Sequence, residues 1–182
     1  DPSKEKIAIF VGSICLRKGI HLLLDAWQKA EVKAKLKIVG KIDPLVEDLV
    51  KGYIVRNPNI EHIDYVNDLI PIYKNADLFI LPSLEEGSPL VTYLALGASL
   101  PVIVSPMGAG GVIEDGKEGY IIDPHNQEEF IKSIRNLIAD DALRYRMAEA
   151  SGKKAVEYTW DRVSKKRIEM LIQRISSKES TE

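Results

Sequence analysis

A turn between an apolar strand and a helix holds the residue types best suited to chemistry in this sequence. Residues 77–81, Asp-Leu-Phe-Ile-Leu, have the length of a buried strand, and the turn 82–88 that follows contains Glu86. Ser88 is a good N-cap, and Pro89 suits the first helical position, where its missing N–H costs nothing. We therefore expect a strand, an acidic turn and a helix start in direct succession.

The predicted helix start would present free backbone N–H groups from Leu90, Val91 and Thr92. Such groups, at the positive end of a helix, favour an anion such as a phosphate. The carboxylate of Glu86 could accept hydrogen bonds from sugar hydroxyls, whereas Glu85 beside it is interpreted as a surface residue. These features predict a sugar-nucleotide site. From the residues alone, the alternative is a capped crossover helix with solvated glutamates.

Short apolar runs alternate with helical patterns along most of the chain. The predicted strands are 7–11, 36–40, 60–63, 77–81, 101–105 and 118–124. Two helices are predicted to start at Gly19 and at Ser88. Five further helices are predicted over residues 44–53, 69–74, 127–139, 141–157 and about 161–175. This alternation predicts an α/β fold, a doubly wound Rossmann-like parallel sheet with helices on both faces. We expect a single domain over residues 1–182, with a frayed tail at 176–182.

In such sheets ligands bind at the carboxyl ends of the strands. Gly12 and Ser13, Gly40, the turn 82–88 and the loop 105–111 all fall at those ends. Trp27 and Trp160 fit apolar helix faces, so we expect both in the core rather than at the site.

The composition excludes several classes of site. With 182 residues and 45% hydrophobic composition, the chain can bury one sizeable core. A net charge of −2 gives no electrostatic reason to bind nucleic acid or an anionic membrane. The three histidines lack metal-ligand spacing, and the single Cys15 allows no internal disulfide, so we expect no metal and a cytoplasmic protein. No apolar run reaches the ~18 residues of a membrane span. The polar start at Asp1, without an initiator Met, suggests a fragment of a longer protein.

An ordered series of short motifs resembles the C-terminal, nucleotide-sugar-binding domain of the family 4 retaining glycosyltransferases. Enzymes of this family have two facing Rossmann-like domains, the GT-B architecture. The matching segments, in order over nearly the whole chain, are Val11-Gly12, Arg17-Lys-Gly19, Leu22-Leu-Leu-Asp-Ala-Trp27, Val39-Gly40, Tyr73-Lys-Asn-Ala-Asp77, Leu81-Pro-Ser83, Glu86-Gly87, Gly97, Pro101-Val-Ile103, Gly108, Asp115-Gly116, Gly119 and Tyr158-Thr-Trp160. The resemblance implies one half of a GT-B enzyme, with the N-terminal acceptor domain absent from this sequence.

The resemblance also implies roles for particular residues. Lys18 matches a lysine that contacts the donor diphosphate, and Glu86 matches an acidic residue near the donor sugar, so these two are the expected catalytic residues. A cation is needed there because negative charge builds on the departing nucleotide. The expected donor-binding residues are Gly12, Ser13, Arg17, Lys18, Glu86, Gly87, Ser88, Leu90, Val91 and Leu94.

Two positions depart from the family's pattern. Ser13 stands where the family usually has an arginine, and Arg17 either supplies that charge from farther along the loop or is solvated. Leu94 stands where the family usually has a second glutamate, eight residues after the first, that holds the ribose hydroxyls. From the residues alone, Leu94 also fits core packing, because it lies four residues after Leu90.

Taken together, the resemblance implies the donor-binding half of a retaining glycosyltransferase, which moves a sugar from a nucleotide diphosphate sugar to an acceptor hydroxyl. The isolated domain is expected to bind nucleotide but to turn over little. Its expected partners are the donor and the N-terminal acceptor domain of the same protein. No metal or other cofactor and no nucleic acid is expected, and peripheral membrane association is expected of the full-length enzyme only. The alternatives are a degenerate sugar-nucleotide-binding or interaction module without activity, and another GT-B enzyme such as an epimerase.

Overall fold

A computed structural model describes residues 5–179, and the side chains of residues 5–175. Its centre is a six-stranded sheet in the order β3-β2-β1-β4-β5-β6, and all neighbouring strands run parallel. The strands are β1 (Lys6–Val11), β2 (Ala34–Val39), β3 (Ile60–Ile63), β4 (Leu78–Leu81), β5 (Val102–Val104) and β6 (Gly119–Ile121). Each predicted strand is confirmed, with small shifts at the ends.

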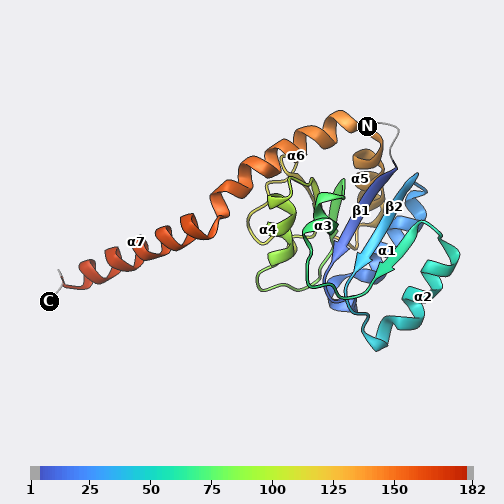
Figure 1. Cartoon of the computed structure of the whole chain (residues 1–182), viewed down its shortest axis with the longest axis horizontal. Coiled ribbons are helices and arrows are strands. Elements are labelled where there is room, and N and C mark those ends of the chain that lie inside the picture. Colours follow the sequence, from blue (N-terminus) through green and yellow to red (C-terminus); the bar gives the residue numbers. More distant parts are fainter. Residues whose placement is uncertain (1–4, 180–182) are drawn as a thin grey trace.

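Helices cover both faces of the sheet (Figure 1). The α-helices are α1 (Ile20–Ala30), α2 (Glu47–Arg56), α3 (Ile70–Lys74), α4 (Leu90–Gly97), α5 (Gln127–Ala139), α6 (Asp141–Ala155) and α7 (Trp160–Glu179). Short 3-10 turns cover Leu16–Lys18, Pro44–Val46 and Val156–Tyr158. Helix α1 packs against α2 and α5, whereas α4 packs against α6. This arrangement is the doubly wound α/β fold that the sequence predicts.

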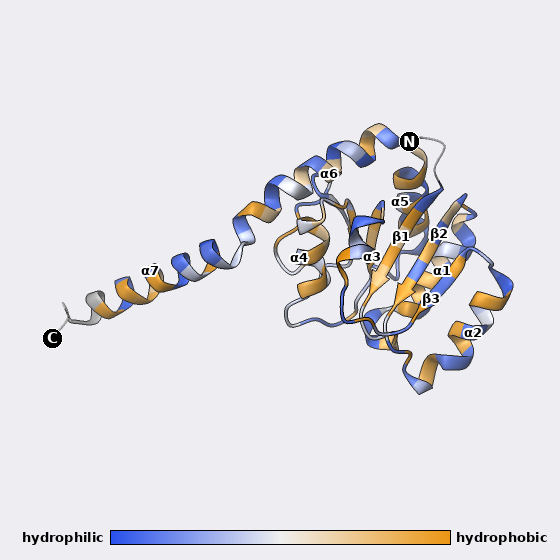
Figure 2. Ribbon diagram, viewed as in Figure 1, coloured by the Kyte–Doolittle hydropathy of each residue, from blue (hydrophilic) through white to orange (hydrophobic). Residues whose placement is uncertain are grey.

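The middle of the sheet is apolar on both faces, as parallel strands covered by helices require. All four residues of β4 are buried, and so are Ile9 and Phe10 of β1. Trp27 of α1 packs in the same core, which confirms the prediction for this tryptophan. Figure 2 shows the hydrophobic strand residues together at the centre of the fold. The buried sheet therefore holds the carboxyl ends of β1, β4 and β5 beside one another.

The last helix differs from its prediction. Helix α7 begins at Trp160 and continues to Glu179, so residues 176–179, predicted as part of a frayed tail, are helical. Residues 180–182 of that predicted tail lie outside the described residues. The helix extends away from the rest of the fold (Figure 1). Trp160 is 79% exposed, so the core position predicted for it is wrong. An apolar helix face indicates burial only where another element covers it. Within residues 5–179, no helix combines the length and apolar character needed to cross a membrane.

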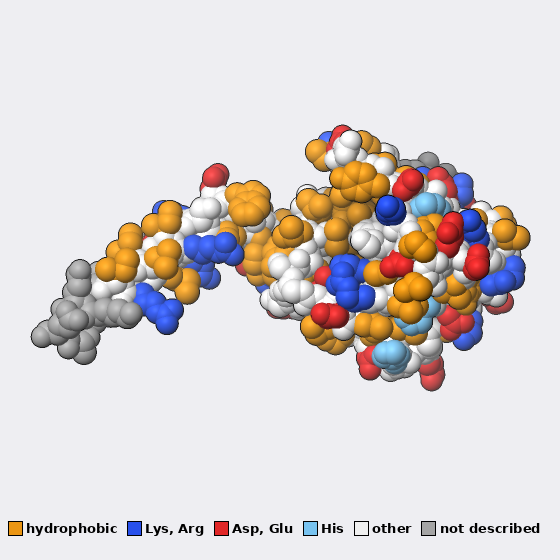
Figure 3. Space-filling model, turned by 90° about the horizontal axis from the view of Figure 1, so that it is seen from below, with side chains coloured by type: hydrophobic (Ala, Val, Ile, Leu, Met, Phe, Trp, Pro, Cys, Tyr) orange, Lys and Arg blue, Asp and Glu red, His pale blue; other side chains and the backbone are white. Residues whose placement is uncertain are grey.

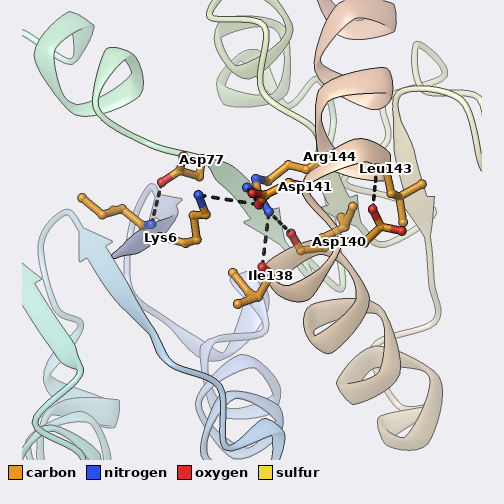
Figure 4. Close-up of polar contacts among 9 residues, drawn as sticks. Lys6, Asp77, Ile138, Asp140, Asp141, Leu143 and Arg144 are labelled. Atoms are coloured by element: carbon orange, nitrogen blue, oxygen red, sulfur yellow. Dashed lines mark hydrogen bonds and ion pairs between the residues drawn. The ribbon is translucent and has the colours of Figure 1, made fainter. Parts of the chain in front are cut away.

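A cluster of polar contacts joins β1 to the start of α6 (Figure 4). Lys6 pairs with Asp141 at 3.6 Å between Nζ and Oδ1, and Asp141 also pairs with Arg144. Arg144 is buried and donates from Nη1 to the carbonyl oxygen of Leu137 at 2.8 Å. The cluster therefore fixes the corner between α5 and α6 against the amino-terminal end of the sheet.

Asp141→Asn should make the stability of the protein less sensitive to acid. The hydrogen bond from Arg144 holds the pKa of the Asp141 carboxyl below its ordinary value of 3.8, and Lys6 acts in the same direction. A depressed pKa contributes stability that is present above the ordinary pKa and is lost as the pH falls through the lowered one. Melting temperatures of both proteins, measured from neutral to about pH 2, should therefore differ most near neutrality and converge in acid. A difference in melting temperature that stays constant across this pH range would exclude the ionised Asp141 carboxylate as its cause.

Candidate functional site

The loops after β1, β2 and β4 approach so closely that glycine is required at the contacts. Gly12, after β1, has a φ of +145°, a conformation that L side chains rarely adopt. A Cβ at Gly40, after β2, would lie 2.0 Å from the carbonyl oxygen of Gly12. A Cβ at Gly19 would lie 2.1 Å from the carbonyl oxygen of Pro82. The loop after β1 therefore packs directly on the turn after β4, where the sequence places the site.

Lys18 and Glu86 form an ion pair across this junction. The Nζ of Lys18 donates to Oε1 of Glu86, although 68 positions separate the residues in the sequence. The side chain of Lys18 is 14% exposed and that of Glu86 is 6% exposed. Ser83 donates from its Oγ to the same Oε1 at 2.7 Å. The structure thus brings together the two residues predicted to be catalytic, in a mostly buried position.

A second set of hydrogen bonds links the turn after β4 to the loop after β5. The buried Ser105 donates from Oγ to the carbonyl oxygen of Ser83 at 2.5 Å and accepts from the N–H of Gly108 at 2.9 Å. Thr92, inside α4, donates from Oγ1 to the carbonyl oxygen of Gly108 at 2.8 Å. Two loops and one helix therefore share a continuous buried network beneath Glu86.

Arg17 is tied to the turn by both its side chain and its backbone. Its Nη1 donates to the carbonyl oxygen of Glu85 at 3.1 Å, and its own carbonyl oxygen accepts from the N–H of Leu84 at 2.8 Å. Ser13 is exposed after β1, and Gly87 is exposed within the turn. The contacts of Arg17 fix the loop 13–18 against the turn. These contacts account for the position of the Arg17 side chain without a ligand.

The helix after the turn begins later than predicted. Helix α4 starts at Leu90, and Pro89 before it has a ψ of 80°, outside the helical range. The N–H of Leu90 donates to the carbonyl oxygen of Ser88 and that of Thr92 to the carbonyl oxygen of Pro89, each at 2.9 Å. The predictions of Ser88 as N-cap and of three free N–H groups are therefore wrong. Of the three, only the N–H of Val91 has no backbone acceptor within the described part of the chain.

One face of α4 is apolar and accessible. Leu90 is 64% and Leu94 is 48% exposed, so core packing is excluded as the reason for Leu94. A groove of about 590 Å³ lies between this face and the start of α7, and Arg162, Lys166 and Arg167 contribute to its lining. Figure 3 shows hydrophobic and basic side chains along the projecting helix. The position that corresponds to the family's ribose-binding glutamate is therefore apolar, accessible and close to cations.

The histidines do not join this site as ligands. His62 lies with Nε2 2.9 Å from the carbonyl oxygen of Gly40. Burial, with a smaller effect from His125, lowers the pKa of His21. Within residues 5–179, no group of three or more His, Cys, Asp and Glu side chains is arranged to hold a metal ion. The expectation that the site works without a metal stays a prediction.

Three contact residues of the site were not identified as such from the sequence. The sequence alone indicates Ser83 only as part of the motif Leu81-Pro-Ser83, and it predicts no side-chain role for Ser105 or Thr92. Their hydroxyls act between segments distant in sequence, as in the bond from Ser105 to Ser83 over 22 positions. The available signal was a serine within two residues of the end of β4 and of β5, where the carboxyl ends of parallel strands lie side by side.

The chain is similar in sequence and in fold to several known proteins. The chain is 29% identical over 154 residues to the capsular polysaccharide biosynthesis glycosyltransferase CapM of Staphylococcus aureus, an alignment of 81% of this chain and 40% of CapM. It is similar in structure to WaaG, a glycosyltransferase involved in lipopolysaccharide biosynthesis, with a TM-score of 0.74 and 27% identity over 85% of this chain and 43% of WaaG. It also has the fold of Anabaena HepE, solved in complex with UDP, with a TM-score of 0.78, 21% identity, and coverage of all of this chain and 50% of HepE.

The same alignments compare the length of this chain with that of the three proteins, and a family model identifies its family. The chain spans 40–50% of the length of the three proteins. Residues 5–140 match the sequence model of the glycosyl transferases group 1 family, which includes β1 to β6 and the whole of the Lys18–Glu86 site. The family and its C-terminal domain agree with the resemblance found in the sequence. The chain belongs to the glycosyl transferases group 1 family.

Proposed function

We propose that this chain is the donor-binding domain of a retaining glycosyltransferase, which transfers a sugar from a nucleotide diphosphate sugar to an acceptor hydroxyl. The observation that carries this proposal is the mostly buried pair of Lys18 and Glu86 at the carboxyl edge of the sheet. A parallel sheet offers this edge to ligands. Membership of a glycosyltransferase family and the UDP complex of HepE support a nucleotide-sugar ligand.

In this proposal Lys18 and Glu86 bind different parts of the donor. The ammonium of Lys18 contacts the diphosphate and stabilises the charge that develops on the departing nucleotide. An ammonium has three N–H donors, so Lys18 can bind a phosphate oxygen while it keeps Glu86. Glu86 accepts hydrogen bonds from the sugar hydroxyls. The N–H of Val91, at the start of α4, has no backbone acceptor among the described residues and in this proposal donates to a phosphate oxygen.

The acceptor site belongs, in this proposal, to another domain of the same polypeptide. The chain spans 40–50% of the length of CapM, WaaG and HepE, which leaves room for such a domain. Four apolar side chains of α7 are exposed and recur at the spacing of one helix face: Ile168, Leu171, Ile172 and Ile175. A domain packed on this face would remove these side chains from water.

Titration with UDP, GDP and ADP tests the proposal directly. We expect this chain to bind at least one of them, with a dissociation constant below about 1 mM by calorimetry. The matching nucleoside monophosphate is the control, and it should bind more weakly because Lys18 is proposed to contact the diphosphate. The absence of binding to all three diphosphates would overturn the proposal.

Glu86→Gln separates recognition of the sugar from recognition of the nucleotide. The amide keeps the size of the side chain but removes the charged acceptor, and hydrogen bonds to charged groups contribute about 1.5–3 kcal/mol. We expect the affinity for the nucleotide sugar to fall by roughly tenfold or more, with a much smaller change for the nucleoside diphosphate. Equal losses for the two ligands, measured by calorimetry, would count against a contact between Glu86 and the sugar.

A degenerate binding module is the second candidate, and the exposed apolar Leu94 is the observation that favours it. Such a module would bind a nucleoside diphosphate without transferring a sugar. The longer polypeptide, assayed for hydrolysis and transfer of the nucleotide sugar whose diphosphate binds, separates the two candidates. Turnover supports the transferase, and binding without turnover supports the module.

A further inference from the structure

The carboxylate of Glu86 is oriented by two donors that act on one of its oxygens. Lys18 Nζ and Ser83 Oγ both donate to Oε1. No donor among the described residues reaches Oε2. Two donors on one oxygen fix the rotation of the carboxylate and leave the other oxygen for a ligand.

Ser83 is itself held rigidly. It is 1% exposed, and its carbonyl oxygen accepts the hydrogen bond from Ser105 at 2.5 Å. Pro82 before it restricts the backbone and lies against Gly19. The Ser83 hydroxyl is therefore a preorganised donor, whereas the ammonium of Lys18 has further N–H groups that a bound anion can share.

The two donors become unequal once a diphosphate is present. The ammonium of Lys18 is then divided between Glu86 and the phosphate oxygens, so its hold on Oε1 weakens. Ser83 faces no such competition because it is buried and carries no charge. The contact from Ser83 thus matters most in the complex with a complete donor, and it matters little for a nucleotide without its sugar.

We propose that Ser83 is a positioning residue that holds Glu86 toward the sugar of the donor, and that Ser105 supports it through the Ser83 carbonyl. This inference rests on the proposed function, since it assumes that Glu86 meets the sugar. The buried hydroxyls of Ser83 and Ser105 would then help the domain to bind a nucleotide sugar more tightly than the nucleotide without its sugar. Preorganised supporting residues of this kind set how well a binding group meets its ligand.

The test is the affinity of Ser83→Ala for a nucleotide and for its sugar ester. The probes are UDP with UDP-glucose, GDP with GDP-mannose and ADP with ADP-glucose, using the pair that the unmodified chain binds. We expect Ser83→Ala to weaken binding of the sugar ester about tenfold and to leave the nucleoside diphosphate within about twofold. Ser83→Thr, which keeps the hydroxyl, should restore most of the loss. Ser105→Ala should reproduce part of it without altering any atom of Ser83 or Glu86.

Ser151→Ala is the matched control. Ser151 is also fully buried and donates to a backbone carbonyl, that of Glu118, but it lies on α6 away from Glu86. It should lower the melting temperature as Ser83→Ala does, with both affinities unchanged. Unaltered discrimination in Ser83→Ala, or equal weakening of both ligands, would overturn the inference while the proposed function stands. If the unmodified chain binds none of the six probes, the proposed function fails, and the inference fails with it.

Discussion

Lys18→Met is expected to lower the free energy of unfolding by about 3 kcal/mol, because it leaves a mostly buried carboxylate without its cation. Glu86 is 6% exposed, and only the hydroxyl of Ser83 would remain to stabilise its charge. Methionine keeps the aliphatic stem of lysine, so little packing is lost. The same change should weaken nucleoside diphosphate binding by roughly tenfold to hundredfold, the scale of one hydrogen bond between charged groups. Urea unfolding and calorimetry measure the two effects separately.

The double variant Lys18→Met with Glu86→Gln identifies the cause of the instability. It removes both charges, so it should recover much of the stability lost in Lys18→Met. Lys29→Met is the matched control, since the ion pair of Lys29 with Asp25 is exposed and contributes at most about 1 kcal/mol. A Lys18→Met variant as stable as Lys29→Met would mean that Lys18 and Glu86 are solvated in solution. Full stability together with unchanged nucleotide affinity would remove Lys18 from the site.

The fold could be predicted from the sequence because its signals are local. The two central strands β1 and β4 and their neighbour β5 are short apolar runs, and β1 and β5 are followed directly by Gly12 and Ser105. Alternation with helices then restricts the topology to a parallel sheet covered on both faces. The close backbone contacts at Gly19 and Gly40 could not be predicted, because only the fold shows which backbone each glycine meets.

The sequence indicates the residues of the candidate site but not the contacts between them. The residues Lys18 and Glu86 were identified, yet nothing in the sequence states that their side chains meet over 68 positions. Their pairing follows from the order of β1 and β4 as neighbours in the sheet, which only the fold provides. A solvated loop lysine and a mostly buried, paired lysine have the same local sequence. The difference decides whether the residue affects stability as well as binding.

The wrong predictions share a physical cause, which is that a local pattern does not specify the tertiary surroundings of a residue. Ser88 and Pro89 resemble a helix cap, but the backbone of Pro89 is not helical and α4 starts one residue later. Trp160 lies on a helical apolar pattern, but α7 leaves the fold at that point and exposes it. Core packing was only the alternative for Leu94, and it is excluded because Leu90 and Leu94 both lie on the accessible face of α4.

Because Leu94 is exposed, the substitution Leu94→Glu can test whether this position meets the ribose of the donor. In the resemblance, this position holds a glutamate that binds the ribose hydroxyls. Because Leu94 is 48% exposed, Leu94→Glu buries no unpaired charge, and Arg162, Lys166 and Arg167 line the same groove. We expect the folding stability to stay within about 1 kcal/mol of the unmodified protein. The affinity for the nucleoside diphosphate should rise about tenfold, as one added hydrogen bond to a charged acceptor allows.

Two controls separate a ribose contact from a general effect of charge. Leu94→Gln adds a polar group of similar size without the charge and should give a smaller gain. The matching 2′-deoxynucleoside diphosphate lacks one of the two hydroxyls that a carboxylate would accept from, so Leu94→Glu should gain much less affinity for it. Equal gains for the ribose and deoxyribose ligands would exclude a hydrogen bond with the 2′-hydroxyl as the cause of the gain. A loss of affinity for both, with unchanged melting temperature, would show that the carboxylate repels the diphosphate and that this face of α4 does not meet the ribose.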